Sequence, residues 1–182
     1  MQWLCFPALA LSVIAAQAET RSITMTPNGA APITVGSITF SATDDGRTTY
    51  AITWDDSRFS DNFLSMRPFK CLDGPDKQWC RVPYPYDIKR RIAGADKTDL
   101  EYDLLFIWKR IGEYGINMWN GVYYKFDPGE IMPGTPLVGR LHEMNMDILS
   151  APPEDGNLRP IREVDLEPGE SDSHWLPVLR IE

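Results

Sequence analysis

Residues 63–85 read FLSMRPFKCLDGPDKQWCRVPYP and place two cysteines, Cys71 and Cys80, on either side of a turn. Between them lies Asp73-Gly74-Pro75-Asp76, a combination of residues that favours a reversal of the chain. The flanking segments, 63–72 and 78–82, are strand-like in composition. This stretch therefore predicts a β-hairpin whose two strands are joined by a disulfide.

The start of the chain indicates the compartment in which those thiols end up. Residues 3–16, WLCFPALALSVIAA, are apolar and uncharged, and Ala16-Gln17-Ala18 precedes the polar Glu19. This is the layout of a secretory signal peptide, residues 1–18, cleaved between Ala18 and Glu19. As a membrane anchor the apolar run would span only about 21 Å, short of a bilayer core of about 30 Å. The sequence thus predicts a periplasmic or secreted protein.

Cleavage would remove Cys5 and leave Cys71 and Cys80, and a cysteine pair in an exported chain indicates a disulfide. A redox site would favour Cys-x-x-Cys, whereas a much longer segment separates these two. A zinc site needs about four ligands, and the only histidines are His142 and His174. A catalytic cysteine would gain nothing from a permanent partner. The structural disulfide is the best of these interpretations.

The mature chain, residues 19–182, has a length that suits a single β-rich domain. We expect a loose lead-in at 19–32 and a long acidic loop, rich in Pro and Gly, at 151–173. The formal net charge of −8 argues against nucleic acid as a partner and against binding to an anionic membrane surface. No segment after the signal peptide has the length and apolar character of an integral membrane segment.

Several segments alternate in the manner of strands. In residues 38–42 and 50–54 apolar and polar positions alternate, and Gly46 lies in the turn between them, which predicts a hairpin. Residues 119–126, followed by a turn at 127–130, and residues 174–181 are further predicted strands. Residues 87–99 are mixed and charged, and we expect a short helical turn there.

Residues 100–108 are ambiguous. Every even position is apolar and the aromatic content is high, which favours a strand that becomes buried on both faces. The alternative is a helix with Thr98-x-x-Glu101 as a capping box and with Leu100, Leu104 and Ile107 on one face. We expect the strand.

Residues 137–149 can likewise be interpreted either as a strand or as a helix. As a strand, their apolar positions switch from odd to even at His142-Glu143, where a β-bulge would restore one apolar face. As a helix, Leu137, Leu141 and Met144 would align, with Ile148 one turn further on. We favour the bulged strand.

Together these patterns predict a mainly β protein: a single antiparallel barrel or sandwich with one disulfide-closed hairpin and little helix. The piece WNGVYY at residues 119–124, with the turn after it, resembles small exported calycin-like barrels. That resemblance favours the barrel over the sandwich and carries no functional residue with it.

A hydrolase elbow, a phosphate loop, a zinc-protease motif and a dinucleotide fingerprint are all absent from the sequence. His142 and Glu143 are the candidates for acid–base or metal chemistry, with Asp147 or His174 as further members. Successive side chains of a strand point to opposite faces, so His142 and Glu143 would converge only through a bulge. The alternative is that both are surface or structural residues.

Aromatic residues concentrate in residues 102–126 and offer a ligand-binding face or a core. The candidates for ligand contact are Trp108, Trp119, Tyr123 and Tyr124. Because Tyr123 and Tyr124 are adjacent, they must face opposite ways, so we expect at least one of them outside the main core. The partner that we expect is either a small apolar or sugar-like molecule or an envelope protein.

Grouped carboxylates at Asp55, Asp56 and Asp61 follow a predicted strand and could bind Ca²⁺. They show no calcium-loop spacing, so we interpret them as turn residues. No metal and no cofactor is expected. The function predicted is therefore a non-enzymatic exported binding protein, and the alternative is a hydrolase-type or metal-dependent enzyme centred on His142 and nearby carboxylates.

Overall fold

A computed structural model describes residues 18–63, 68–82, 88–150 and 156–182 of the chain. The predicted signal peptide lies outside these residues except for Ala18. The first strand begins directly after it, at Glu19.

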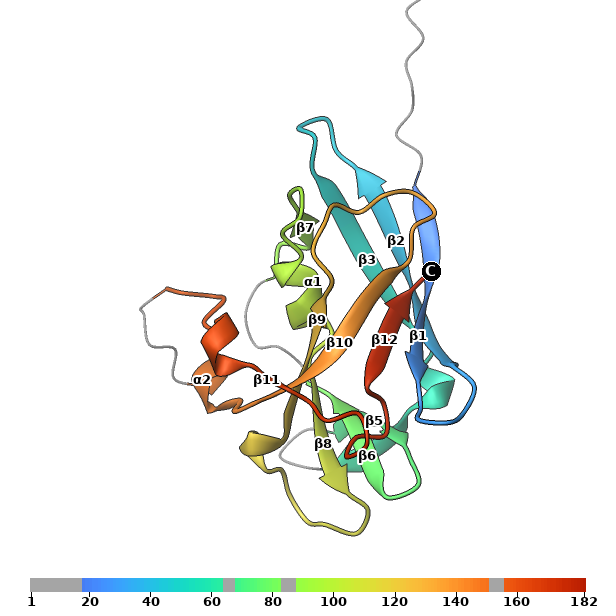
Figure 1. Cartoon of the computed structure of the whole chain (residues 1–182), viewed down its shortest axis with the longest axis vertical. Coiled ribbons are helices and arrows are strands. Elements are labelled where there is room, and N and C mark those ends of the chain that lie inside the picture. Colours follow the sequence, from blue (N-terminus) through green and yellow to red (C-terminus); the bar gives the residue numbers. More distant parts are fainter. Residues whose placement is uncertain (1–17, 64–67, 83–87, 151–155) are drawn as a thin grey trace, which may run out of the picture.

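Twelve strands occur in the described residues and form one antiparallel sheet, with little helix, as predicted. Along the sheet the order is β4-β5-β6-β8-β9-β10-β12-β1-β2-β3-β7, and β11 pairs with β10 beside this path. The strands are β1 Glu19–Thr26, β2 Ile33–Ala42, β3 Thr48–Trp54, β4 Ser60–Phe63, β5 Pro68–Asp73, β6 Lys77–Arg81, β7 Arg91–Ile92, β8 Phe106–Arg110, β9 Gly121–Phe126, β10 Leu137–Met144, β11 Glu167–Pro168 and β12 Val178–Ile181. Two short α-helices, α1 Thr98–Asp103 and α2 Asp147–Ser150, and three 3₁₀ turns, η1 Asp56–Arg58, η2 Met118–Asn120 and η3 Glu163–Asp165, complete it (Figure 1).

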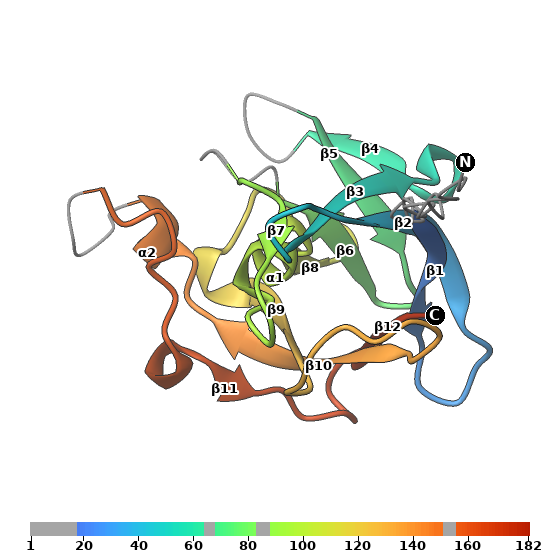
Figure 2. The same ribbon diagram turned by 90° about the horizontal axis from the view of Figure 1, so that it is seen from above.

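The sheet curls around an apolar interior. The ring of Trp54 in β3 meets the ring of Phe106 in β8 edge to face, with 6.0 Å between centroids, although several strands separate them along the sheet. Seen from above, the strands follow a curved path (Figure 2). Among the described residues no ladder joins the end strands β4 and β7, so the choice of barrel over sandwich stays a prediction.

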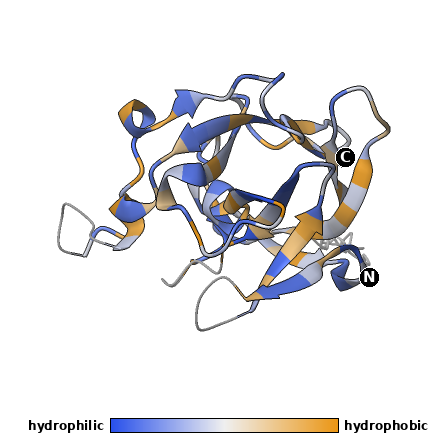
Figure 3. Ribbon diagram, turned by 90° about the horizontal axis from the view of Figure 1, so that it is seen from below, coloured by the Kyte–Doolittle hydropathy of each residue, from blue (hydrophilic) through white to orange (hydrophobic). Residues whose placement is uncertain are grey.

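Two apolar clusters lie on the two faces of the sheet. The first fills the interior and includes Trp79, Phe106 and Tyr124. The second lies on the outer face beneath α1 and α2 and includes Ile107 and Tyr123. Neighbouring residues of one strand therefore enter different clusters, as a period of two requires. Hydropathy colouring shows hydrophobic and hydrophilic residues side by side along the ribbon (Figure 3).

The two predicted hairpins are confirmed. In the first, Ile38 pairs with Ile52 and Phe40 with Tyr50, and Gly46 in the turn has a φ of +76°, a backbone conformation that favours glycine. In the second, Cys71 of β5 lies directly opposite Cys80 of β6, and the two form a disulfide. Both cysteines are buried in the outer cluster.

The predicted loose lead-in at 19–32 is wrong over most of its length, because β1 occupies Glu19–Thr26 and lies inside the sheet between β12 and β2. Ile23 and Met25 are fully buried in the interior. Ile23 and Met25 are the apolar residues of a segment that is otherwise mostly polar, so its composition does not indicate a strand. The strand forms because it pairs with β2 on one side and with β12 on the other.

Residues 100–108 combine both interpretations, so the prediction of one continuous strand is wrong for its first half. Helix α1 ends at Asp103, and β8 begins at Phe106. The capping box of the helix alternative is absent: Asp96 accepts hydrogen bonds from the backbone N and the hydroxyl of Thr98, while Glu101 turns toward β9. Residue 87 lies outside the described residues. Among residues 88–99, β7 occupies Arg91–Ile92, and the helix that we expected begins only at Thr98 with α1.

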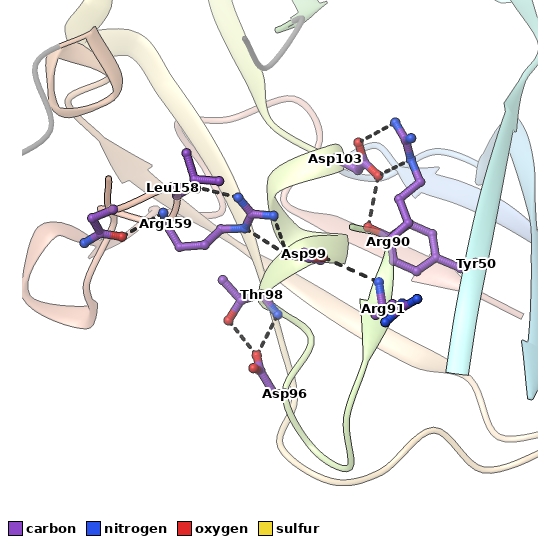
Figure 4. A network of polar contacts seen from close by, with 10 residues as sticks. Tyr50, Arg90, Arg91, Asp96, Thr98, Asp99, Asp103, Leu158 and Arg159 are labelled. Atoms are coloured by element: carbon purple, nitrogen blue, oxygen red, sulfur yellow. Dashed lines mark hydrogen bonds and ion pairs between the residues drawn. The ribbon is translucent and has the colours of Figure 1, made fainter. Parts of the chain in front are cut away.

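Acidic side chains fix α1 to its surroundings on two sides (Figure 4). Asp103 accepts a hydrogen bond from the hydroxyl of Tyr50 at 3.0 Å and pairs with Arg90 at 2.9 Å. Asp99 pairs with Arg159, which brings the segment after residue 156 against the helix. Burial, and then the charge of Asp103, raise the pKa of Tyr50 well above its usual range.

The bulge predicted at His142-Glu143 is absent: β10 runs against β9 in one continuous register from Gly139 to Met144, and α2 follows it. The apolar switch has a different cause. Leu137 and Leu141 enter the interior cluster, whereas Met144 enters the outer one. The strand therefore contributes to both cores and needs no extra residue.

Part of the predicted acidic loop, residues 151–155, lies outside the described residues. The remainder carries η3 and β11 as well as loop. Over the described part of the chain, no helix has the length and apolar character needed to cross a membrane.

Candidate functional site

His142 and Glu143, the two candidates for chemistry, lie on opposite faces of β10 and do not converge. His142 lies on the outer face, where its Nδ1 is 3.0 Å from the carbonyl oxygen of Arg140. Because a carbonyl only accepts, this nitrogen carries the hydrogen. Glu143 instead meets His174, with 2.7 Å between Oε1 and Nε2.

The four candidate aromatic residues occupy four different environments. Tyr124 is buried in the interior, where its hydroxyl accepts a hydrogen bond from Trp79 Nε1 and donates one to the carbonyl of Leu176. Tyr123 is buried in the outer cluster and donates to Glu101 at 2.5 Å. The expectation that one of this pair lies outside the main core is met by this second cluster.

Trp108 and Trp119 also differ from each other in their surroundings and exposure. Trp108 is half-buried beside His174, with 6.0 Å between ring centroids, and the ammonium group of Lys77 lies 4.4 Å above its ring. Trp119, in η2, is 71% exposed. The four aromatic residues therefore do not line one common cavity.

A pocket of about 470 Å³ opens on the outer face beside His142; we call it the His142 pocket. It lies between α1, the facing strands β9 and β10, and η3. A recess of about 120 Å³ shares His142, Lys125 and Glu163 with it. The charged and titratable residues of its wall are Asp96, Lys97, Glu101, Lys125, Asp127, Arg140, His142 and Glu163.

Two cations on adjacent strands lie side by side in the wall of the His142 pocket. Lys125 of β9 lies directly opposite Arg140 of β10, and His142 follows two residues along on the same face. Both cations are loosely paired: Lys125 Nζ is 3.9 Å from Glu101, and Arg140 Nε is 3.5 Å from Asp127. Like charges directly opposite each other destabilise a sheet, so this arrangement is not one that stability alone would favour.

The floor of the pocket is rigid. Glu101 is 3% exposed and accepts hydrogen bonds from the Tyr123 hydroxyl and from the backbone N–H of Phe126, at 2.9 Å. Lys97 donates to the carbonyl oxygens of Asp127 and Gly129. Burial lowers the pKa of Lys97, and the charge of Glu101 opposes that effect. Glu101 and Lys97 are thus held by the protein itself, and Asp96 is held by Thr98. Lys125, Arg140 and His142 are the groups that can donate to a ligand, and the exposed Glu163 lies beside them.

His174 forms a second polar centre that sequence patterns did not reveal. It is 3% exposed and lies between the rings of Trp79 and Trp108. Its Nδ1 has no hydrogen-bond partner among the described residues. Burial lowers the pKa of this imidazole, the charge of Glu143 raises it, and Lys77 lowers it further. The ring is enclosed, and it lines neither the His142 pocket nor its recess.

The carboxylates that we interpreted as turn residues each have a separate protein partner. Asp55 accepts from Ser57 at the start of η1, Asp56 pairs with Arg81, and Asp61 pairs with Lys70. Within the described ranges no three His, Cys, Asp or Glu side chains gather into a set that could hold a metal ion.

Comparison with protein-family models, with curated proteins and with solved structures found no match to this chain.

Proposed function

We propose that this protein is an exported binding protein that holds a small anionic molecule, carrying a carboxylate or a phosphate, in the His142 pocket. The binding groups are Lys125 and Arg140, and His142 adds a hydrogen-bonding imidazole on the same face. No covalent chemistry is part of this proposal.

The facing pair Lys125–Arg140 is the observation that carries the proposal. In a chain of formal net charge −8, these two cations and His142 share one face of two adjacent strands at the mouth of a pocket. An anion placed between them would relieve their repulsion and would form charge-assisted hydrogen bonds with both. The guanidinium of Arg140 can bind a carboxylate or a phosphate through two parallel N–H groups.

Two features support the export part of the proposal. Strand β1 begins at Glu19, directly after the expected cleavage position. The Cys71–Cys80 disulfide is a bond typical of oxidising compartments such as the periplasm.

Isothermal titration calorimetry with citrate and with inorganic phosphate tests the proposed site, using wild type, Arg140→Gln and Lys125→Gln. Each substitution should weaken binding by about ten- to hundredfold, since each removes one charge-assisted contact worth roughly 1.5–3 kcal/mol. Arg110→Gln is the matched control, because it removes the same charge from an exposed residue of β8 outside the pocket. An equal loss in Arg110→Gln, or no binding of either anion to wild type, would contradict the proposal.

A further inference from the structure

A second hollow lies on the other side of the segment that walls the His142 pocket. It has a volume of about 500 Å³, and we call it the Trp119 groove. Within residues 163–168, Glu163, Leu166 and Pro168 border the pocket and its recess, whereas Val164, Asp165 and Glu167 border the groove. The remaining lining residues come from η2, from β10 and from the turn and helix after it: Trp119, Glu143, Met144, Asn145 and Ile148.

Two large apolar side chains of the groove are strongly exposed. Trp119 is 71% exposed and Val164 is 81% exposed. Exposed apolar residues are informative where they gather at one site, as Trp119 and Val164 do in this groove. Tryptophan is also enriched among the residues that dominate binding energy.

The backbone that carries them is fixed. The side chain of Asn117 accepts a hydrogen bond from Trp119 N at 3.1 Å, and Met146 N donates to Met118 O at 2.8 Å. On the opposite wall, Asp165 accepts from the backbone N–H of Arg162 and pairs with its guanidinium. The groove is thus already formed, which reduces the entropy lost when a partner binds.

The charge of the groove is negative. Glu143, Asp165 and Glu167 line it, and none of its lining residues is a lysine or an arginine. Asp165 is paired with Arg162, so Glu143 and Glu167 are the carboxylates that a partner would meet. Glu143 and Glu167 lie directly opposite each other in the β10–β11 ladder. The two carboxylates repel each other, as the two cations Lys125 and Arg140 do in the pocket, and a cation placed between the carboxylates would relieve that repulsion.

We propose that the Trp119 groove docks a short segment of a partner protein in which Lys or Arg residues stand next to large apolar residues, in a turn-like conformation that lets both kinds of side chain face the groove. A cationic side chain lies between Glu143 and Glu167, and the neighbouring apolar side chains cover Trp119 and Val164. A small cation alone would leave both apolar residues in water, so charge and apolar area together identify a peptide segment as the occupant. The proposal does not depend on anion binding in the His142 pocket.

Fluorescence anisotropy with three labelled peptides tests this docking site. The peptide GSKLKIKSG carries both features, GSKSKSKSG keeps only the charge, and GSELEIESG reverses it. We expect the first to bind wild type at least about tenfold more tightly than either of the others. Equal binding of GSKSKSKSG or GSELEIESG would overturn the proposal, and so would spermine that binds as tightly as GSKLKIKSG.

Variants locate the binding on the protein. Trp119→Ala and Glu167→Gln should each weaken GSKLKIKSG by about tenfold. Tyr114→Ala removes another fully exposed aromatic ring, and Asp44→Asn removes a carboxylate from the β2–β3 turn, both outside the groove. Each control should bind like wild type, and an equal loss in either would show general attraction to an acidic surface and would overturn the proposal. Arg140→Gln should leave peptide binding unchanged, which keeps this result separate from the anion test.

Discussion

The carboxylate of Glu143 lies 2.7 Å from Nε2 of His174 and joins β10 to the segment that leads into β12. Because a carboxylate only accepts, Nε2 carries the hydrogen, and in the neutral ring Nδ1 is then an acceptor. The pair holds an imidazole between two tryptophan rings at one end of the interior. We interpret this pair as a structural contact, since the imidazole ring is enclosed.

Acidification should destabilise the protein through His174. Burial lowers its pKa in the folded state below the ordinary value of about 6.5. Between the two values the unfolded chain binds more protons, so the free energy of unfolding falls as the pH falls below about 6.5, by at most about 1.4 kcal/mol per pH unit.

The variant His174→Gln tests that contribution, because glutamine can still donate to Glu143 but does not titrate. Urea unfolding between pH 7.5 and pH 5 should show a smaller loss of stability in His174→Gln than in wild type. Parallel curves for the two proteins would show that His174 does not contribute to the pH dependence.

The hydroxyl of Tyr124 should be worth more to stability than its size indicates. It bridges Trp79 Nε1 and the carbonyl of Leu176 inside the core. Tyr124→Phe leaves both groups buried without a partner and should cost about 1–3 kcal/mol in urea unfolding. The control Tyr114→Phe changes a fully exposed ring and should stay within about 0.5 kcal/mol of wild type. Equal stabilities for the two variants would be inconsistent with this bridge.

Glu101 should be the most sensitive carboxylate of α1. Glu101→Ala leaves the Tyr123 hydroxyl and the Phe126 N–H without their acceptor, and we expect a loss of about 2–5 kcal/mol in the free energy of unfolding. Glu101→Gln keeps an acceptor oxygen and should lose less. The exposed Glu130→Ala serves as the matched control. A Glu101→Ala protein as stable as Glu130→Ala would contradict the geometry.

Reduction of the disulfide should lower stability measurably. For Cys71 and Cys80, at a sequence separation of 9, loop-closure entropy in the unfolded chain gives about 2.5–3 kcal/mol. Thermal unfolding with and without dithiothreitol measures the effect, and the double variant Cys71→Ala/Cys80→Ala should be insensitive to the reductant. Identical midpoints for oxidised and reduced wild type would contradict the prediction.

The parts of the fold that were predictable from sequence are those with local causes. The hairpin around Gly46 and the hairpin closed by Cys71 and Cys80 depend on turn residues and on alternation within a few positions. Strand β1 was missed because its buried residues Ile23 and Met25 lie among polar residues, and because one of its two ladders, with β12, joins residues far apart in the chain. Met144 led to the incorrect prediction of a bulge because we assumed that all apolar residues of the strand face one core. The strand in fact contributes to two cores, and Met144 lies in the outer one.

The candidate site was predictable only in part. His142 lines a pocket, as a candidate residue should, and the opposite orientation of Glu143 follows from the strand period. The partner of Glu143 was not predictable, because His174 is 31 residues away in the sequence and the course of the loop between them determines whether they meet. The cations Lys125 and Arg140 are ordinary surface residues until the β9–β10 register places them together.

The pairing of β1 with β12 sets the order of events in assembly. Ile23 faces Ile181 in the middle of the sheet, and Ser22 and Glu182 exchange two backbone hydrogen bonds. Residue 181 must therefore have left the ribosome before the ladder between β1 and β12 can form. Until then β1 can pair only with β2, and its other edge has no strand beside it.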